Sequence, residues 1–221
     1  GRSFSVEEYS DETYRAVPSS LGGSPQDAAV WNTLADQQVV NIGDVGAALH
    51  LRDALSTLSN QQEPLVRSAR DLRARDFRSG DYIVLGGPFA NPWAHLLEQE
   101  PFNFQFKTLP GPSMILVNRN PAPGEQPIYS ADDEGHGYAR VALVPNLTKT
   151  GQALMIAGMS MESTEAAVDF CLSPDSMKLL SALHASGTNN IPPFEALLRT
   201  KKEGGTGVRA ELIAVRPAKP N

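Results

Sequence analysis

Residues 81–106 constrain the fold more than any other stretch, because they combine a buried strand, a glycine turn and a capped helix. Residues 82–85 form an apolar run without alternation, which indicates a strand covered on both faces, as in an α/β sheet. Gly86 and Gly87 permit a tight turn after this strand. Asn91 precedes a proline, the pattern of a helix N-cap followed by proline at the first helical position. We therefore expect a helix that begins at Asn91.

Two other stretches repeat this design of strand, turn and helix. Residues 38–42 are a predicted strand and residues 46–58 a predicted helix, because the apolar positions change from a short run to helical spacing. Residues 153–157 form the third predicted strand of this kind. The helix that follows starts at Ser163 or Thr164, since either hydroxyl can serve as its N-cap. The chain thus contains three similar units.

Further strands lie between and after these units. The candidates are residues 65–68, 102–106, 113–117, 126–130, 137–144, 152–157 and the terminal pair 194–201 and 208–216. The loop between the strands 137–144 and 152–157 is short enough to connect antiparallel neighbours, so we expect a mixed sheet. Arginine and aspartate alternate over residues 67–81, which indicates a solvated, salt-bridged helix.

These elements predict an α/β fold with one main domain. We expect a three-layer sandwich whose mixed, partly parallel sheet is Rossmann-like and ends in a C-terminal β-hairpin. The single α/β domain spans residues 37–217. Residues 1–36 form an N-terminal arm, because their few apolar positions are irregularly spaced; within the arm, residues 25–35 have the composition of a short helix.

The three turns predict where a ligand would bind. Ligands of open α/β sheets bind at the carboxyl edge of the strands, and a helix N-terminus there offers free N–H groups to a small polar or anionic ligand. The predicted ligand-binding residues are Asp44, Gly86, Gly87, Asn91, Ser160 and Thr164. Each also has a purely structural interpretation, in which the glycines form turns and the polar residues cap helices.

No motif in the chain nominates catalytic residues, a metal site or a cofactor, and we expect none of the three. The sequence lacks a phosphate-binding loop, a nucleophile elbow and a dinucleotide fingerprint, and its four histidines lack metal-ligand spacing. The acidic run at residues 132–136 either binds a divalent cation or is a solvated turn. Cys171 lies in an apolar context, which favours packing over nucleophilic chemistry.

Composition bears on partners and location. The net charge of −6 comes without a basic stripe, which argues against a nucleic-acid surface and against attraction to anionic lipid. No apolar run approaches the length of about 20 residues that spans a bilayer, so we expect no direct membrane insertion. The sequence begins with Gly1, and we expect a targeting or membrane segment upstream of it. The location is then either the cytoplasm or the extracytoplasmic side of a single-pass membrane protein.

Three stretches carry a resemblance to a known family: GGPFANPWAHLLE, NFQF and YARVALVPNLTKTGQALMIAGMSMESTEAAVDFCLSP. They resemble an uncharacterised α/β domain of acidobacterial and related soil-bacterial proteins, whose members carry IGxFxNxW, RFxF and TGxxxxIAAGxxxxGTEAAxxFL. The resemblance covers roughly residues 39–216 and implies a domain that follows a membrane-spanning segment, with no known activity. The sequence departs from the family at Gly87, Pro88 and Ser163.

These observations predict a non-catalytic sensory or small-ligand-binding domain, the soluble part of a larger bacterial protein. One alternative is a hydrolase or glycosyl-transfer enzyme that acts on a nucleotide or sugar, with Asp44 or Glu162 as acid or base. Another is a structural protein-interaction module that pairs through its terminal hairpin. The sequence does not determine the oligomeric state.

Overall fold

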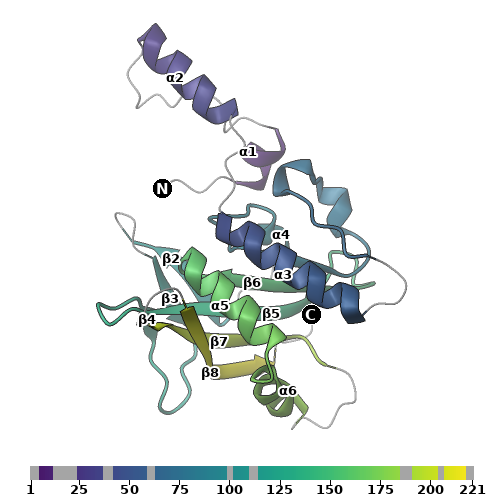
Figure 1. The fold of residues 1–221 in the computed structure, drawn as a ribbon, viewed down its shortest axis with the longest axis vertical. Helices are drawn as coiled ribbons and strands as arrows, with labels where there is room; N and C mark the ends of the chain where they lie inside the picture. The colour runs from purple at the N-terminus through teal and green to yellow at the C-terminus, as the bar shows by residue number, and fades with distance from the viewer. Residues whose placement is uncertain are drawn as a thin grey trace.

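A five-stranded sheet, sheet A, forms the centre of the molecule in the computed structural model (Figure 1). The structure describes residues 5–11, 24–36, 42–58, 63–98, 102–109, 114–184, 191–203 and 207–217. The strand order of sheet A is β1 (Tyr82–Leu85), β6 (Gln152–Gly158), β5 (His136–Pro145), β7 (Phe194–Glu203) and β8 (Gly207–Pro217). Among the described strands of sheet A, only the β1–β6 pair is parallel, so the predicted mixed, partly parallel sheet of an α/β fold is confirmed. The β7–β8 pair is the predicted C-terminal hairpin.

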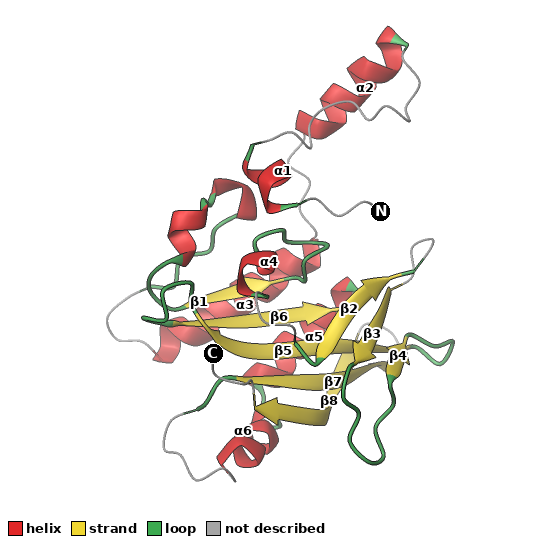
Figure 2. Cartoon of the chain, turned by 180° about the vertical axis from the view of Figure 1, so that it is seen from behind, coloured by secondary structure: helices red, strands yellow, loops and turns green. Residues whose placement is uncertain are grey.

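A second, antiparallel sheet B consists of β2 (Phe104–Thr108), β3 (Met114–Asn118) and β4 (Ile128–Ser130). All three strands were expected from their alternating or β-branched sequences, but they do not join sheet A. Sheet B instead packs over β7 and β8, with Phe104 and Leu116 against Leu197 and Ala214. Figure 2 shows it crossing one face of the central strands.

Three helices cover the opposite face of sheet A (Figure 1). They are α3 (Ile42–Leu58), α5 (Met161–Leu172) and α6 (Ser176–His184). The alternation of β5 explains this division, because Ala139 and Val141 pack with the helices while Ala142 and Val144 face the other way. The short helix α4 (Ala94–Leu97) and the buried Trp93 cover that other face beside β1. Strand β1 is therefore covered on both faces, as its sequence predicted.

Two helices precede the α/β part of the chain: α1 (Val6–Ser10) and α2 (Pro25–Asp36). The predicted helix at residues 25–35 corresponds to α2, which stands away from the sheets in Figure 1. None of the helices within the described ranges is both long and apolar enough to cross a lipid bilayer.

The first predicted strand, at residues 38–42, is not supported. Residues 37–41 lie outside the described residues, and Ile42 is the first residue of α3, so the strand prediction is wrong at that position. Helix α3 accordingly begins four residues before the predicted start at Gly46. Asp44 therefore lies in the first turn of a helix and not in a turn before it.

The predicted helix starts at Asn91 and at Ser163 or Thr164 need correction. Helix α4 begins at Ala94, because Asn91 closes a local turn in which the Trp93 N–H donates to its Oδ1 at 3.2 Å. Helix α5 is capped earlier, by Ser160, whose extended backbone places Oγ 3.2 Å from the Ser163 N–H. Ser163 and Thr164 are buried in the first turns of the helix.

The predicted strand at 65–68 and the predicted helix at 67–81 are also wrong. Leu65 and Val66 are exposed without regular structure, and two short 3-10 helices follow, η2 (Ala69–Asp71) and η3 (Ala74–Phe77). Polar side chains bond the local backbone here: the Asp76 carboxylate accepts from the Arg73 N–H at 2.7 Å. Such bonds compete with a continuous helix.

Substitution of Gly158 by alanine is expected to destabilise the fold. A Cβ at Gly158 would lie 2.4 Å from the Thr164 backbone nitrogen, so the first turn of α5 would have to move off the end of β6. Overpacking of this kind costs about 1–3 kcal/mol of the free energy of unfolding, measured by urea denaturation.

Gly46→Ala is the matched control for Gly158→Ala. Gly46 is exposed in α3, and the nearest atom to its added Cβ would be Glu165 Oε1 at 3.9 Å. Because alanine is the better helix former, this variant should gain about 0.5–1 kcal/mol. Equal stability of the two variants would contradict the close packing of α5 on β6.

Candidate functional site

The carboxyl edge of β1 and β6 brings the predicted turns together. Because the two strands are parallel, both end at the same edge of sheet A, where the Gly86 N–H donates to the Ile156 carbonyl at 2.9 Å. Gly87 lies against the Ala157 side chain. Helix α5 begins directly after β6, and α3 begins beside it, with Gly43 against Met161. In Figure 1 the two helices run side by side from this edge.

The turn after β1 is held by its own polar groups. Gly86 has a φ of 85°, a left-handed conformation that favours glycine. The Asn91 amide donates from Nδ2 to the Leu85 carbonyl at 3.2 Å, and its Oδ1 accepts from the Trp93 N–H. The two predicted site residues Gly86 and Asn91 thus hold the turn at the end of β1 in one conformation.

The turn after β6 is also internally bonded. Ser160 Oγ caps α5, and the Thr164 hydroxyl joins the helix to the strand: it accepts from the Gly158 N–H at 3.0 Å and donates to the Ser160 carbonyl at 3.2 Å. Ser163, next to Thr164, bonds the Thr200 hydroxyl of β7 at 2.8 Å. The hydroxyl groups of Ser160 and Thr164 therefore have structural partners at this edge.

Two carboxylates lie close to these turns. Burial raises the pKa of Asp44, which is half-buried in the first turn of α3. Bonds from its own backbone N–H, from the Ser160 hydroxyl and from Lys202 lower the pKa of Glu162 in the first turn of α5. The Lys202 Nζ lies 3.3 Å from Glu162 Oε1. The N-terminus of α5, which favours negative charge, is thus occupied by a carboxylate of the chain itself.

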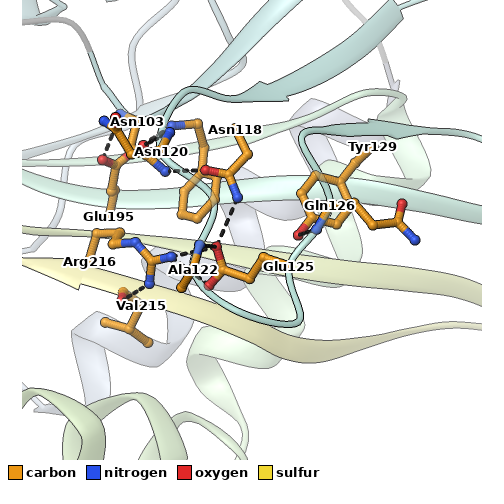
Figure 3. A network of polar contacts seen from close by, with 11 residues as sticks. Asn103, Asn118, Asn120, Ala122, Glu125, Gln126, Tyr129, Glu195, Val215 and Arg216 are labelled. Atoms are coloured by element: carbon orange, nitrogen blue, oxygen red, sulfur yellow. Dashed lines mark hydrogen bonds and ion pairs between the residues drawn. The ribbon is translucent and has the colours of Figure 1, made fainter.

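A second polar site lies between the two sheets and was not predicted. The buried carboxylate of Glu195 on β7 accepts from the backbone N–H groups of Asn103 at 2.7 Å and Phe104 at 2.9 Å (Figure 3). Beside it on β5, the buried Arg140 donates from Nη1 to the Phe104 carbonyl at 2.9 Å. Burial raises the pKa of Glu195, although these N–H groups and two arginines oppose the rise.

Arg140 is enclosed by aromatic rings and one acid. Its guanidinium carbon lies 4.0 Å from the centroid of the Phe102 ring and 5.3 Å from that of Phe106, and its Nη2 is ion-paired with Glu98. The Nε atom is buried and has no hydrogen-bond partner among the described residues. A guanidinium at these distances from aromatic rings is stabilised by cation–π attraction.

The polar contacts continue across the edge of sheet B to β8. Asn103 Nδ2 donates to Asn118 Oδ1 at 2.7 Å, and Asn118 Nδ2 donates to Glu125 Oε2 at 2.8 Å. Glu125 is ion-paired with Arg216 of β8, as Figure 3 shows. Burial opposes ionisation of Glu125, but the bonds from Ala122, Asn118 and Arg216 prevail and lower its pKa. The network thus ties the loop after β3 to the last strand of sheet A.

Charged residues among apolar strand residues are the feature of the sequence that indicates this network. Arg140 is the single Arg, Lys, Asp or Glu residue of β5, and Glu195 stands between apolar residues at the start of β7. Buried charges require partners. Their partners are backbone groups of residues 103 and 104, which no spacing rule connects to either strand. The signal therefore predicts a buried polar contact but not its location.

The acidic run at residues 132–136 and Cys171 are the remaining features discussed from the sequence. His136 Nδ1 lies 2.8 Å from Asp132 Oδ2, and within the described ranges no group of three or more His, Cys, Asp and Glu side chains is arranged to hold a metal ion. Burial raises the pKa of the Cys171 thiol to about 12, so the thiolate is not the form present near neutral pH. Cys171 packs against the helix-side core.

The chain was compared with known proteins at three levels. No protein-family model, no curated protein and no solved structure matches it.

Glu125 and Glu195 should give opposite pH dependences of stability. The pKa of Glu125 is lowered on folding, so its contribution is present above its unfolded pKa of about 4.3 and is lost as the pH falls through the folded value. The pKa of Glu195 is raised, so its contribution is lost as the pH rises through the folded value. Chemical denaturation at several pH values measures both.

The test compares each glutamine variant with the wild type. The stability difference between wild type and Glu125→Gln should grow from about pH 3 to pH 6, whereas the difference for Glu195→Gln should shrink as the pH rises above about 4.3. Glu63→Gln is the control, because Glu63 is exposed. If the stability difference changed with pH in the same direction for Glu125→Gln and Glu195→Gln, the opposite pKa shifts of the two residues would be refuted.

Proposed function

We propose that this chain is a non-catalytic sensory or small-ligand-binding domain and that its ligand binds at the carboxyl edge of β1 and β6. The observation that carries the proposal is the parallel pairing of the two strands, which brings the turn at residues 86–91 and the N-terminus of α5 to one edge. Ligands of open α/β sheets bind at such edges. The internal bonds of Asn91, Ser160 and Thr164 support it, because they pre-organise the two turns before a ligand arrives.

The charges near this edge suggest which ligand it takes. Asp44 and Glu162 are acceptors when ionised, and Glu162 already occupies the end of α5 that would attract an anion. A small polar ligand with hydroxyl or ammonium donors therefore fits the edge better than an anion does. Sugars, polyols and small amines have this chemistry.

The proposal extends to the finer description of the fold and to its context. We propose a Rossmann-like, three-layer sandwich, supported by the parallel β1–β6 pair and by the helices on one face of sheet A with α4 and sheet B on the other. We also propose membership of the soil-bacterial family whose motifs the chain resembles. The domain would then be the soluble part of a larger bacterial protein, on the extracytoplasmic side of a single-pass membrane anchor.

Thermal unfolding in a panel of sugars, polyols and amines tests the ligand site. A ligand present at a hundred times its Kd stabilises the native state by about 2.7 kcal/mol, which corresponds to a rise in Tm of roughly 5–10 °C for a chain of this size. We expect at least one compound class to produce such a rise. Asp44→Asn and Glu162→Gln should each reduce it.

Controls for the panel separate ligand binding from general stabilisation. The Glu63→Gln variant changes an exposed carboxylate elsewhere in the chain and should respond to the same compounds as the wild type. A panel without any stabilising compound, or a rise in Tm that survives both edge variants, would remove this edge as the ligand site.

One observation favours a second function, an enzyme that hydrolyses or transfers a glycosyl group of a nucleotide or sugar. The pKa of Asp44 is raised by burial while that of Glu162 is lowered by hydrogen bonds, and an acid–base pair needs two carboxyls whose pKa values diverge in this way. Asp44 would then be the general acid and Glu162 the general base.

A hydrolysis assay over nucleotides and glycosides tests the second function. General acid–base catalysis contributes about 10²–10⁴-fold, so Asp44→Asn should lower kcat by that factor while Gly46→Ala, on the same helix, leaves it unchanged. No turnover by the wild-type protein on any substrate of the panel would decide against the enzyme.

A further inference from the structure

Strand β8 forms one edge of sheet A. It pairs with β7 along one side, and among the described residues no strand pairs with its other side. The strand runs for 11 residues, Gly207–Pro217. A long edge of this kind presents a row of backbone N–H and C=O groups that can pair with another strand.

A β-bulge limits which part of β8 can pair in a regular way. Leu197 is opposite Ala214 and Leu198 is opposite Leu212, so Ile213 is the extra residue. Bulges bend the strand that contains them, and β8 changes direction along its length in Figure 1. The regular part of its edge is therefore the segment from residue 207 to residue 212.

The charges of this segment are complementary to themselves. Arg209 and Glu211 are exposed on either side of the buried Ala210. If two copies pair antiparallel about a two-fold axis at Ala210, Arg209 of each copy lies opposite Glu211 of the other. The same register places the half-buried Val208 opposite Leu212. A register centred on Leu212 would instead place Arg209 opposite Val215 and lose both ion pairs.

The helix-side surface beside this segment is hollow. A depression of about 240 Å³ is lined by the end of α5 and by Val208, Arg209 and Ala210 of β8. It is smaller than the 300–1,000 Å³ typical of ligand pockets. Its lining combines apolar side chains of α5 and β8 with the polar Asp169, Ser173 and Asp175, so it can take the end of one apolar side chain. In the register centred on Ala210, Leu212 of the second copy lies beside it.

We propose that the free edge of β8 pairs antiparallel with the β8 edge of a second copy of this chain, in the register centred on Ala210. Sheet A then continues across the two-fold axis, and each Arg209–Glu211 pair joins the two copies. Because only about six residues of each edge take part, the dimer belongs to the weak class of interfaces. This proposal is independent of the ligand site, which lies at the other end of the strand order, beside β1 and β6.

Sedimentation analysis over a concentration series tests the dimer and its register. The wild-type protein should show a monomer–dimer equilibrium. Arg209→Glu alone places two carboxylates opposite each other, and Glu211→Arg alone does the same with two guanidinium groups. Each should raise the dimer dissociation constant roughly tenfold. A 1:1 mixture of the two variants restores opposite charges at both positions and should dimerise as the wild type does.

Two controls distinguish an effect at the β8 edge from a change in net charge and from a loss of stability. Arg75→Glu makes the same charge change at an exposed position in η3 and should dimerise normally. Within one copy, Glu211 also pairs with Arg199 of β7 at 2.7 Å, and Arg209 Nη2 lies 4.0 Å from Asp175 Oδ2. All four side chains are partly or fully exposed, so loss of either pair should leave the thermal unfolding of the monomer nearly unchanged. The proposal is overturned by a wild-type protein that stays monomeric, by a dimer insensitive to both variants, or by a mixture that does not restore it.

Discussion

The buried side chains of Glu195 and Arg140 hold the two sheets together. Among the described residues, sheet B shares no backbone ladder with sheet A. Without these two side chains, the N–H groups of Asn103 and Phe104 and the Phe104 carbonyl would lose their partners at the face of β5 and β7. The Glu195 carboxylate accepts hydrogen bonds from the two N–H groups, and the Arg140 guanidinium donates one to the Phe104 carbonyl. A buried polar or charged group without partners is costly, so the two side chains and the backbone groups stabilise each other only in this arrangement.

The position of sheet B shapes the rest of the molecule. It covers the face of sheet A over β7 and β8 that the helices leave open, while Trp93 and α4 cover the same face beside β1. Helices α3 and α5 can then occupy the opposite face, and both begin at the carboxyl edge of β6. This edge differs from a simple anion site, because the Glu162 carboxylate already lies at the N-terminus of α5.

The central elements were predictable where local pattern and tertiary environment agree. The unbroken apolar run of β1 indicated burial on both faces, and the short loop after β5 indicated an antiparallel neighbour. Helix boundaries were less predictable. Ser160, Ser163 and Thr164 can all cap a helix, and Ser160 is the one that caps α5. The hydroxyls of Ser163 and Thr164 bond instead to Thr200 and to the Gly158 N–H, and only the tertiary structure shows these contacts.

The sequence by itself determined the identity of most strands, the mixed sheet and the terminal hairpin, because alternation, apolar runs and loop lengths are properties of adjacent residues. Only the tertiary structure decided that β2, β3 and β4 form a separate sheet and that Arg140 and Glu195 hold it. It also decided that Asp44 and Glu162 lie near one edge. These outcomes depend on contacts between residues far apart in the chain. Arg140 and Phe104 are 36 positions apart and Glu195 and Asn103 are 92 apart, and local pattern carries no information about such pairs.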